Sequence, residues 1–148
     1  LRVILAIYVS NFFAKLLVVE VPPILSVAAI IKNDNKILFI DLSYFNGYGL
    51  PGGIVQKDEN INQALEREVL EETGLKIKNY KIFGSYPSKF KGLNTLSIVF
   101  LAEADGEIVN SNEGSVVWLN PKNALGKLFY KDSEKAVRDY IKNVHTSN

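Results

Sequence analysis

The sequence predicts one α+β domain built around a mixed β-sheet, preceded by an apolar segment that is expected to be helical. Its 148 residues suit a single domain, and a hydrophobic content of 47% is enough to close one core. Short runs rich in β-branched residues surround two segments with helical periodicity. Because no repeat, low-complexity tract or linker interrupts this order, we divide the chain into an N-terminal segment, residues 1–23, and one folded domain, residues 24–148.

The N-terminal segment is apolar on nearly every side up to residue 19, with Arg2 and Lys15 as its only charges. Its longest uncharged stretch, residues 3–14, is shorter than the ~18–20 residues that a membrane-spanning helix needs, and no small-residue cleavage site follows it. Three interpretations stay open for residues 1–19: a helix that packs on the domain or on a second copy in a homodimer, a peripheral membrane contact, and a signal segment. The first is favoured, and with it a cytoplasmic location.

The folded domain begins with a predicted hairpin, because the turn residues Asn33-Asp34-Asn35 separate two β-rich runs. A loop rich in aromatic residues and glycine, residues 43–53, follows it and leads toward the first helix. In chain order, the predicted strands are Leu25–Ile31, Lys36–Leu42, Lys76–Tyr86, Thr95–Ala104 and Val116–Leu119.

Two helices are predicted from periodicity and capping residues. The first runs from about Asn60 to Thr73, where Asn60 and Gln63 have the spacing of a capping box and Gly74 stands at the place of a left-handed C-terminal cap. The second covers Ser133–Lys142, with Asp132 as its expected N-cap.

The first helix carries acidic side chains where a helix selected for packing would carry aliphatic ones. At about 3.6 residues per turn, Leu65 and Val69 form an apolar stripe; Glu72 falls inside it, and Glu68 and Glu71 lie along its edge. Crowded carboxylates repel one another, and burial adds a desolvation cost to each. A hard divalent cation, Mg²⁺ or Mn²⁺, would relieve both costs. The alternative is a solvated acidic face that pairs with nearby basic residues.

Composition narrows the chemistry that such a site can use. The 17 basic and 16 acidic residues leave a net charge of +1, so no long-range field favours a nucleic acid, and none is expected as a partner. The absence of cysteine excludes thiol nucleophiles and thiolate metal sites, and the one histidine, His145, lies in a polar tail. Carboxylates are therefore the main candidates for acid-base and metal chemistry.

Glycine and arginine residues around the acidic helix complete a recognisable motif. Gly52 and Gly53 allow close approach of backbone to a ligand, and Arg67 can hold a carboxylate through a bidentate pair. The run from Gly53 to Leu75 resembles a complete Nudix box, and residues 25–119 are similar to that family in their order of elements. The matching pattern is Gly53-x5-Glu59-x7-Arg67-Glu68-Val69-x-Glu71-Glu72-x-Gly74-Leu75.

The resemblance implies an α/β/α sandwich with a mixed sheet, and a hydrolase that cleaves a diphosphate linkage with water. Arg67, Glu68 and Glu71 would be the catalytic residues, with Glu68 the first candidate for the general base. The implied ligands of Mg²⁺, or of Mn²⁺ in its place, are the Gly52 carbonyl, Glu68, Glu71, Glu72 and, from a later loop, Glu113. Glu103 and Glu107 are alternatives to Glu113.

The substrate is expected to be a small-molecule nucleoside diphosphate derivative, such as an ADP-ribose-like sugar or a damaged nucleoside triphosphate. Tyr48, Tyr86 and Phe90 flank the motif and could stack on a base, although such rings also serve as ordinary core residues. Two other functions stay open. One is a ligand-binding module without catalysis, and the other is a membrane-associated hydrolase of a lipid-linked diphosphate that uses residues 1–19.

Overall fold

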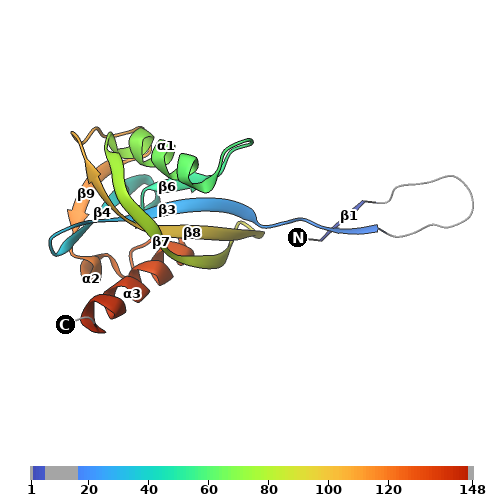
Figure 1. The fold of residues 1–148 in the computed structure, drawn as a ribbon. Helices are drawn as coiled ribbons and strands as arrows, with labels where there is room; N and C mark the ends of the chain where they lie inside the picture. The colour runs from blue at the N-terminus through green and yellow to red at the C-terminus, as the bar shows by residue number, and fades with distance from the viewer. Residues whose placement is uncertain (1, 6–16, 147–148) are drawn as a thin grey trace, which may run out of the picture.

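The computed structural model describes residues 2–5 and 17–146. Residues 24–146 form a β-sheet with helices on both sides, and residues 2–5 and 17–20 form a separate two-stranded sheet (Figure 1). The strands are β1 (Arg2–Leu5), β2 (Leu17–Glu20), β3 (Ile24–Asn33), β4 (Lys36–Leu42), β5 (Gly47–Gly49), β6 (Gly52–Ile54), β7 (Lys76–Phe90), β8 (Leu93–Asp105) and β9 (Ser115–Leu119). The helices are the short 3-10 turn η1 (Ser43–Phe45), α1 (Ile61–Thr73), α2 (Pro121–Ala124) and α3 (Lys131–Thr146).

A seven-stranded mixed sheet forms the body of the domain. Its main path runs β5-β4-β3-β8-β7, with β6 paired to β3 and β9 paired to β4. The central pair, β3 and β8, is parallel, and the other pairs are antiparallel. The predicted β3–β4 hairpin is confirmed, since Lys32 pairs with Ile37 next to the turn.

Alternate residues of β3 face two separate cores, as a strand buried on both sides requires. Val27 and Ala29 pack with α1 residues such as Leu65, whereas Ala28 and Ile30 belong to the core that α3 closes. Figure 1 shows α1 and α3 on opposite sides of the sheet. The predicted α/β/α sandwich with a mixed sheet is therefore confirmed.

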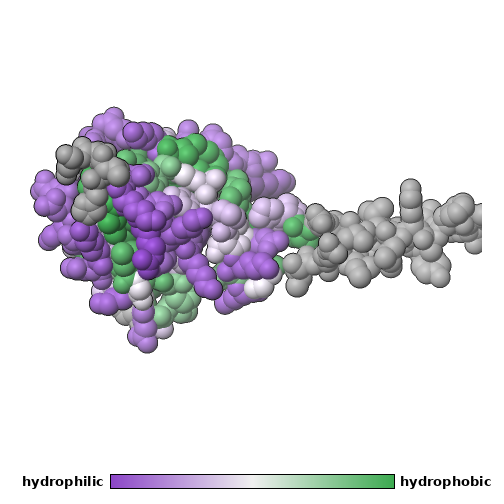
Figure 2. Space-filling model, turned by 90° about the horizontal axis from the view of Figure 1, so that it is seen from below, coloured by the Kyte–Doolittle hydropathy of each residue, from purple (hydrophilic) through white to green (hydrophobic). Residues whose placement is uncertain are grey.

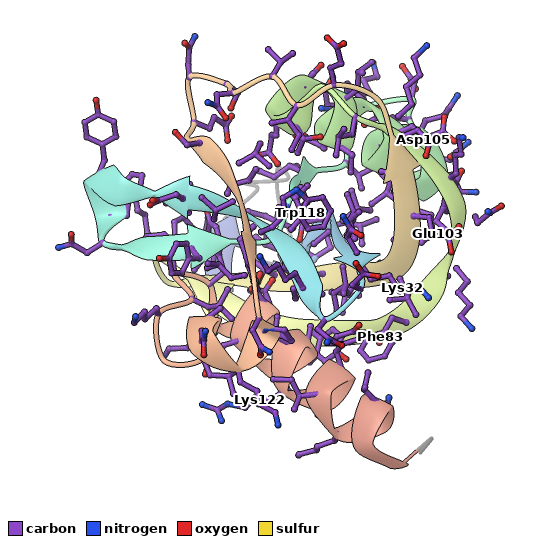
Figure 3. The ribbon with its side chains drawn as sticks, turned by 90° about the vertical axis from the view of Figure 1, so that its left-hand side faces the viewer. Lys32, Phe83, Glu103, Asp105, Trp118 and Lys122 are labelled. Atoms are coloured by element: carbon purple, nitrogen blue, oxygen red, sulfur yellow. The ribbon has the colours of Figure 1, made fainter. Side chains whose placement is uncertain are left out.

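The outer surface of the α3 layer is mostly polar, with apolar patches beside it (Figure 2). Helix α3 holds the sheet through Ala136 and Val137, which are fully buried, and Phe83 contacts Tyr140 with ring centroids 6.3 Å apart. Figure 3 shows Phe83 beside α3, with Glu103 and Asp105 at the outer edge of the sheet.

The described residues of the N-terminal segment form β-strands, whereas a helix was predicted there. Arg2–Leu5 and Leu17–Glu20 pair as antiparallel strands, with Arg2 opposite Glu20. These apolar, β-branched stretches satisfy their backbone groups by pairing with each other instead of by helical hydrogen bonds. The rest of the predicted helix, residues 6–16, lies outside the described residues.

Several predicted boundaries need correction. Strand β7 continues to Phe90, beyond the predicted end at Tyr86, because it forms a long hairpin with β8. Helix α3 begins at Lys131, so Asp132 lies in its first turn instead of at the N-cap, and its Oδ1 accepts a hydrogen bond from the Ser133 N–H at 2.9 Å. The predicted loop over residues 43–53 contains η1, β5 and part of β6, and the short helix α2 was not predicted.

Candidate active site

Helix α1 is fixed at both ends by the residues that the sequence indicates. Asn60 Oδ1 accepts hydrogen bonds from the backbone N–H groups of Asn62 and Gln63 at 3.0 and 2.9 Å, and Gln63 Oε1 accepts one from the Asn60 N–H at 2.9 Å. Gly74 ends the helix in the left-handed region with φ 75°, and its N–H donates to the Leu70 carbonyl at 2.9 Å. These caps set the rotation of α1, and so the direction of its glutamates.

Glu72 is buried in the apolar stripe of α1, as its helical position predicts, with only 7% of its surface exposed. Its Oε2 accepts a hydrogen bond from the Gly52 N–H at 2.8 Å, and the side chain of Glu113, in the loop before β9, lies beside the same carboxyl group. Burial raises the pKa of Glu72 to about 9; the Gly52 N–H opposes this rise, and Glu113 and Glu68 add to it. Ionising all of these carboxyl groups at once would therefore cost free energy, because they are close together and partly buried.

At both Gly52 and Gly53 a β-carbon would meet close neighbours. Gly52 has φ 153°, and a β-carbon there would lie 2.1 Å from the Val27 carbonyl oxygen on β3. At Gly53 a β-carbon would lie 2.3 Å from Glu68 Oε1. The first glycine lets β6 pair with β3, and the second lets the Glu68 carboxylate lie directly over the backbone.

Arg67 connects the acidic residues of the motif. Its Nε and Nη2 donate to the two carboxylate oxygens of Glu59 at 2.8 and 2.9 Å, while Nη1 donates to Glu68 Oε1 at 2.7 Å. Nη2 also donates to the Ile54 carbonyl at 3.2 Å. The hydrogen bonds from Arg67, followed by the one from the Gln56 N–H, lower the pKa of Glu59 to about 2. The predicted bidentate pair of Arg67 with a carboxylate is present, and its partner is Glu59; Glu68, the next residue in the sequence, accepts a single hydrogen bond.

Glu71 is exposed, with 59% of its side chain accessible, and its Oε2 lies 3.4 Å from Arg67 Nη1. Glu103, an alternative to Glu113, instead accepts a hydrogen bond from Asn79 at 3.0 Å at the outer edge of the sheet (Figure 3). As the side chains stand, no group of three or more acidic or histidine residues in residues 2–5 and 17–146 converges closely enough to hold a metal ion. The predicted metal ligands are Glu68, Glu71, Glu72 and Glu113, with the Gly52 carbonyl, and their side chains would have to move closer together to bind one ion.

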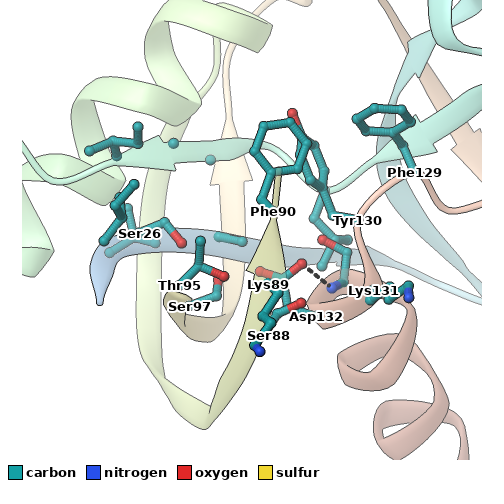
Figure 4. Close-up of a pocket in the computed structure, with 18 of the residues that line it drawn as sticks. Ser26, Ser88, Lys89, Phe90, Thr95, Ser97, Phe129, Tyr130, Lys131 and Asp132 are labelled. Carbon is teal, nitrogen blue, oxygen red and sulfur yellow. Dashed lines mark hydrogen bonds between the residues drawn. The ribbon is translucent and has the colours of Figure 1, made fainter. Parts of the chain in front are cut away.

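A cavity of about 360 Å³ adjoins this acidic cluster on the α3 side of the sheet. Gly52 and Gly53 form part of its lining, so the cavity and the glutamates share the same piece of backbone. One wall is aromatic, made by Phe90, Phe129 and Tyr130, as Figure 4 shows. The pKa of Tyr130 is raised, mainly by burial and further by the nearby charges of Glu113, Glu72 and Asp132, which indicates that this wall extends toward the acids.

Of the aromatic residues predicted to contact substrate, only Phe90 lines this cavity. Tyr86 lies on the same face of β7, but it is 5% exposed and belongs to the core under α3, which corrects that prediction. Tyr48 packs on Phe39 with ring centroids 6.1 Å apart and lies outside this cavity, although it borders a smaller, polar depression with Lys127. Both rings are used for packing, as the alternative interpretation expected.

Other residues of the site were missed from the sequence. Phe129 and Tyr130 precede α3 and reach the cavity only because the chain returns to the sheet there, which no local pattern indicates. Ser26, Thr95 and Ser97 also line the cavity. Their signal was available, since hydroxyl residues interrupt otherwise aliphatic strands at these positions.

Comparisons with known proteins agree with this geometry. A family model described as NUDIX domain matches residues 22–140. The ADP-ribose pyrophosphatase of Methanocaldococcus jannaschii is 36% identical over 126 residues, which are 81% of this chain and 74% of that protein.

Solved structures are similar as well. A NUDIX hydrolase from Nitrosomonas europaea superimposes with a TM-score of 0.73 and 23% identity, over 82% of this chain and 90% of that one, which supports the fold. A bifunctional NMN adenylyltransferase/ADP ribose pyrophosphatase from Francisella tularensis, solved with AMP and a Mn ion, gives a TM-score of 0.67 and 25% identity, over 82% of this chain and 42% of that one. In the part of this chain that the structure describes, no helix is both long and apolar enough to cross a membrane.

Proposed function

Because the chain belongs to the NUDIX domain family, we propose that it is a divalent-metal-dependent hydrolase that cleaves the diphosphate linkage of a nucleoside diphosphate derivative. The observation that carries the proposal is the buried Glu72 carboxyl group, held by the Gly52 N–H and pressed against Glu113. An ADP-ribose-like compound is the first substrate to test, since a relative with 36% identity is named ADP-ribose pyrophosphatase.

The donor set fits Mg²⁺, or Mn²⁺ in its place. Hard divalent cations prefer carboxylate and carbonyl oxygens, and a cation beside Glu72 would favour the ionised form that burial now disfavours. Glu68 uses Oε1 to accept from Arg67, and its Oε2 makes no hydrogen bond within the described residues. We propose Glu68, Glu71, Glu72, Glu113 and the Gly52 carbonyl as the ligands.

In the proposed reaction, water adds to one phosphorus atom, the bridging P–O bond breaks, and the bridging oxygen leaves on the other phosphate. The metal would neutralise the diphosphate oxygens and lower the pKa of the attacking water. Glu68 is the proposed general base, because Arg67 fixes its carboxylate at 2.7 Å and Gly53 leaves room above the backbone. Arg67 keeps this position through its bidentate pair with Glu59, and Glu71 lies at the solvent side of the group.

The first experiment measures product release from ADP-ribose, other nucleoside diphosphate sugars, dinucleotides and nucleoside triphosphates, with Mg²⁺, with Mn²⁺ and with a chelator. Glu68→Gln is expected to lower kcat by roughly 10²- to 10⁴-fold, the usual contribution of a general base. Glu66→Gln is the matched control, because Glu66 lies on the same helix and its carboxylate accepts a hydrogen bond from the Tyr80 hydroxyl, away from the site. Activity of Glu68→Gln above about a tenth of wild type would assign the base elsewhere.

Peripheral membrane contact through residues 1–19, a homodimer and a cytoplasmic location stay predictions. Co-sedimentation with liposomes tests the first of them, and a protein that remains in the supernatant argues against a lipid-linked substrate. A measured sedimentation coefficient tests the homodimer.

A further inference from the structure

The floor of the cavity is made of hydroxyl side chains from adjacent strands. Ser26 on β3 is the register partner of Ser97 on β8, and Thr95 on β8 is the partner of Ser88 on β7. Because Thr95 and Ser97 are two residues apart, they point to the same face of the sheet. All of these residues line the cavity, so the floor is a continuous row of uncharged hydroxyl groups.

Within the part of the chain that the structure describes, none of these hydroxyl side chains makes a hydrogen bond, although Ser97 is only 3% exposed. No fully enclosed polar atom of the described residues lacks a partner, so the Ser97 hydroxyl must reach the open space of the cavity. A nearly buried hydroxyl that opens into a cavity is expected to bond to whatever fills it.

The wall above the floor is suited to a flat ring. Phe90 and Tyr130 have ring centroids 5.7 Å apart, and those of Phe129 and Tyr130 are 4.9 Å apart. Figure 4 shows these rings together on one side of the cavity, with Ser26, Thr95 and Ser97 on the strands below them. The volume of about 360 Å³ falls within the range of small-molecule sites and suits a nucleoside better than a whole dinucleotide.

We propose that this cavity holds the nucleoside half of the substrate and that its hydroxyl floor accepts different bases with similar affinity. A hydroxyl group both donates and accepts, and it rotates to suit its partner. The floor therefore meets an amino group of one base and an oxo group of another equally well. The charged side chains in the lining come from the end of β7, the turn after it and the start of α3, and not from the floor; they are Lys89, Lys91, Lys131 and Asp132. The inference rests on the proposed function in one respect: it takes the nucleoside that binds in the cavity to be part of the substrate.

Base tolerance is the opposite of what a floor of fixed donors or acceptors would give. A site built around groups of one polarity leaves them unpaired with the wrong ligand and rejects that ligand strongly. Here the loss of one hydroxyl group should weaken the binding of every nucleotide by a similar factor, whichever base it carries. The expected factor for Ser97→Ala is roughly three- to tenfold, the usual contribution of one neutral hydrogen bond.

The test measures binding of AMP, GMP, UMP and ribose 5-phosphate to the full chain by titration calorimetry, in chelator so that no metal contributes. We expect Kd values for AMP and GMP within about tenfold of each other and weaker binding of ribose 5-phosphate by at least about tenfold, since base stacking is lost. Ser97→Ala should weaken the binding of AMP and of GMP by similar factors. Phe90→Leu, which removes the ring and keeps apolar bulk, should weaken both by at least about fivefold.

Ser85→Ala is the matched control, because Ser85 lies on β7, is exposed and does not line the cavity. Three results would overturn the proposal: ribose 5-phosphate that binds as tightly as AMP, a preference above about 100-fold between AMP and GMP, or wild-type affinity in Ser97→Ala. Since no turnover is needed, the expected binding pattern in a protein that hydrolyses nothing would refute only the proposed function. Hydrolysis without this pattern would refute only the base-tolerant cavity.

Discussion

Replacing Glu72 by glutamine tests the electrostatic reasoning behind the acidic cluster directly. Glutamine has nearly the same shape, and its Oε1 can still accept the Gly52 N–H that Glu72 now accepts at 2.8 Å. It carries no proton that titrates. We therefore expect Glu72→Gln to change the pH dependence of stability in the metal-free protein while leaving the fold intact.

The sign follows from the direction of the pKa shift. Burial raises the pKa of Glu72 from 4.5 to about 9, so between these values the native protein binds more protons than the unfolded chain. The free energy of unfolding of the wild type should then fall as pH rises through this window, by at most about 1.4 kcal/mol per pH unit. At pH 5 the two proteins should differ little. At pH 8 the variant should be more stable, by up to about 4–5 kcal/mol.

Urea unfolding followed by circular dichroism, in chelator and at several pH values between 5 and 9, measures this difference. Glu66→Gln, an exposed position on the same helix, should give a curve parallel to the wild type. If the Glu72→Gln curve is also parallel, Glu72 is not a buried carboxyl group that holds its proton. Added Mg²⁺ should restore the wild type at pH 8 and have a smaller effect on the variant, since a ligand stabilises only the state that binds it.

Further predictions concern the residues around this carboxyl group. Gly53→Ala places a β-carbon 2.3 Å from Glu68 Oε1 and should lower kcat by roughly tenfold or more with an unchanged circular dichroism spectrum; wild-type activity would show that the Glu68 carboxylate can move without loss. Arg67→Lys keeps the charge but loses the bidentate pair with Glu59, so kcat should fall by roughly tenfold and charge alone should not rescue it. Asn60→Ala removes the α1 cap and should lower the free energy of unfolding by about 1 kcal/mol in urea titrations; no change would mean that the cap is replaced by water.

The parts of the fold that the sequence predicts are those with a strong local signal. Helix α1 was placed correctly because its caps, Asn60 and Gly74, and its apolar stripe all agree on one rotation. The same rotation predicted that Glu72 is buried. The location of Glu113 beside Glu72 required the resemblance, because the two residues are far apart in the sequence.

What the sequence could not predict depends on contacts between distant segments. Tyr86 and Phe90 are both aromatic and face the same side of β7, yet only Phe90 lines the cavity. Tyr86 lies in the core under α3, whereas Phe90 contacts Phe129 and Tyr130, just before α3 begins. Similarly, Arg67 sits next to Glu68 in sequence, but its bidentate pair is with Glu59, which a turn before α1 brings within 2.8 Å. Patterns along the chain show which residue types are present, and three-dimensional packing decides which partner each one meets.

The relation of the acidic cluster to the cavity limits where the reaction can occur. Glu68 and Glu72 belong to α1 on one side of the sheet, whereas the aromatic wall and hydroxyl floor lie on the side of α3. Gly52 and Gly53 contact both, since they touch the glutamates and line the cavity. A nucleoside in the cavity would therefore carry its diphosphate toward these glycines, which join the cavity to the glutamates. A substrate bound in this way would present its scissile bond to the glutamates and its base to the hydroxyl floor, so that cleavage and base recognition depend on separate sets of residues.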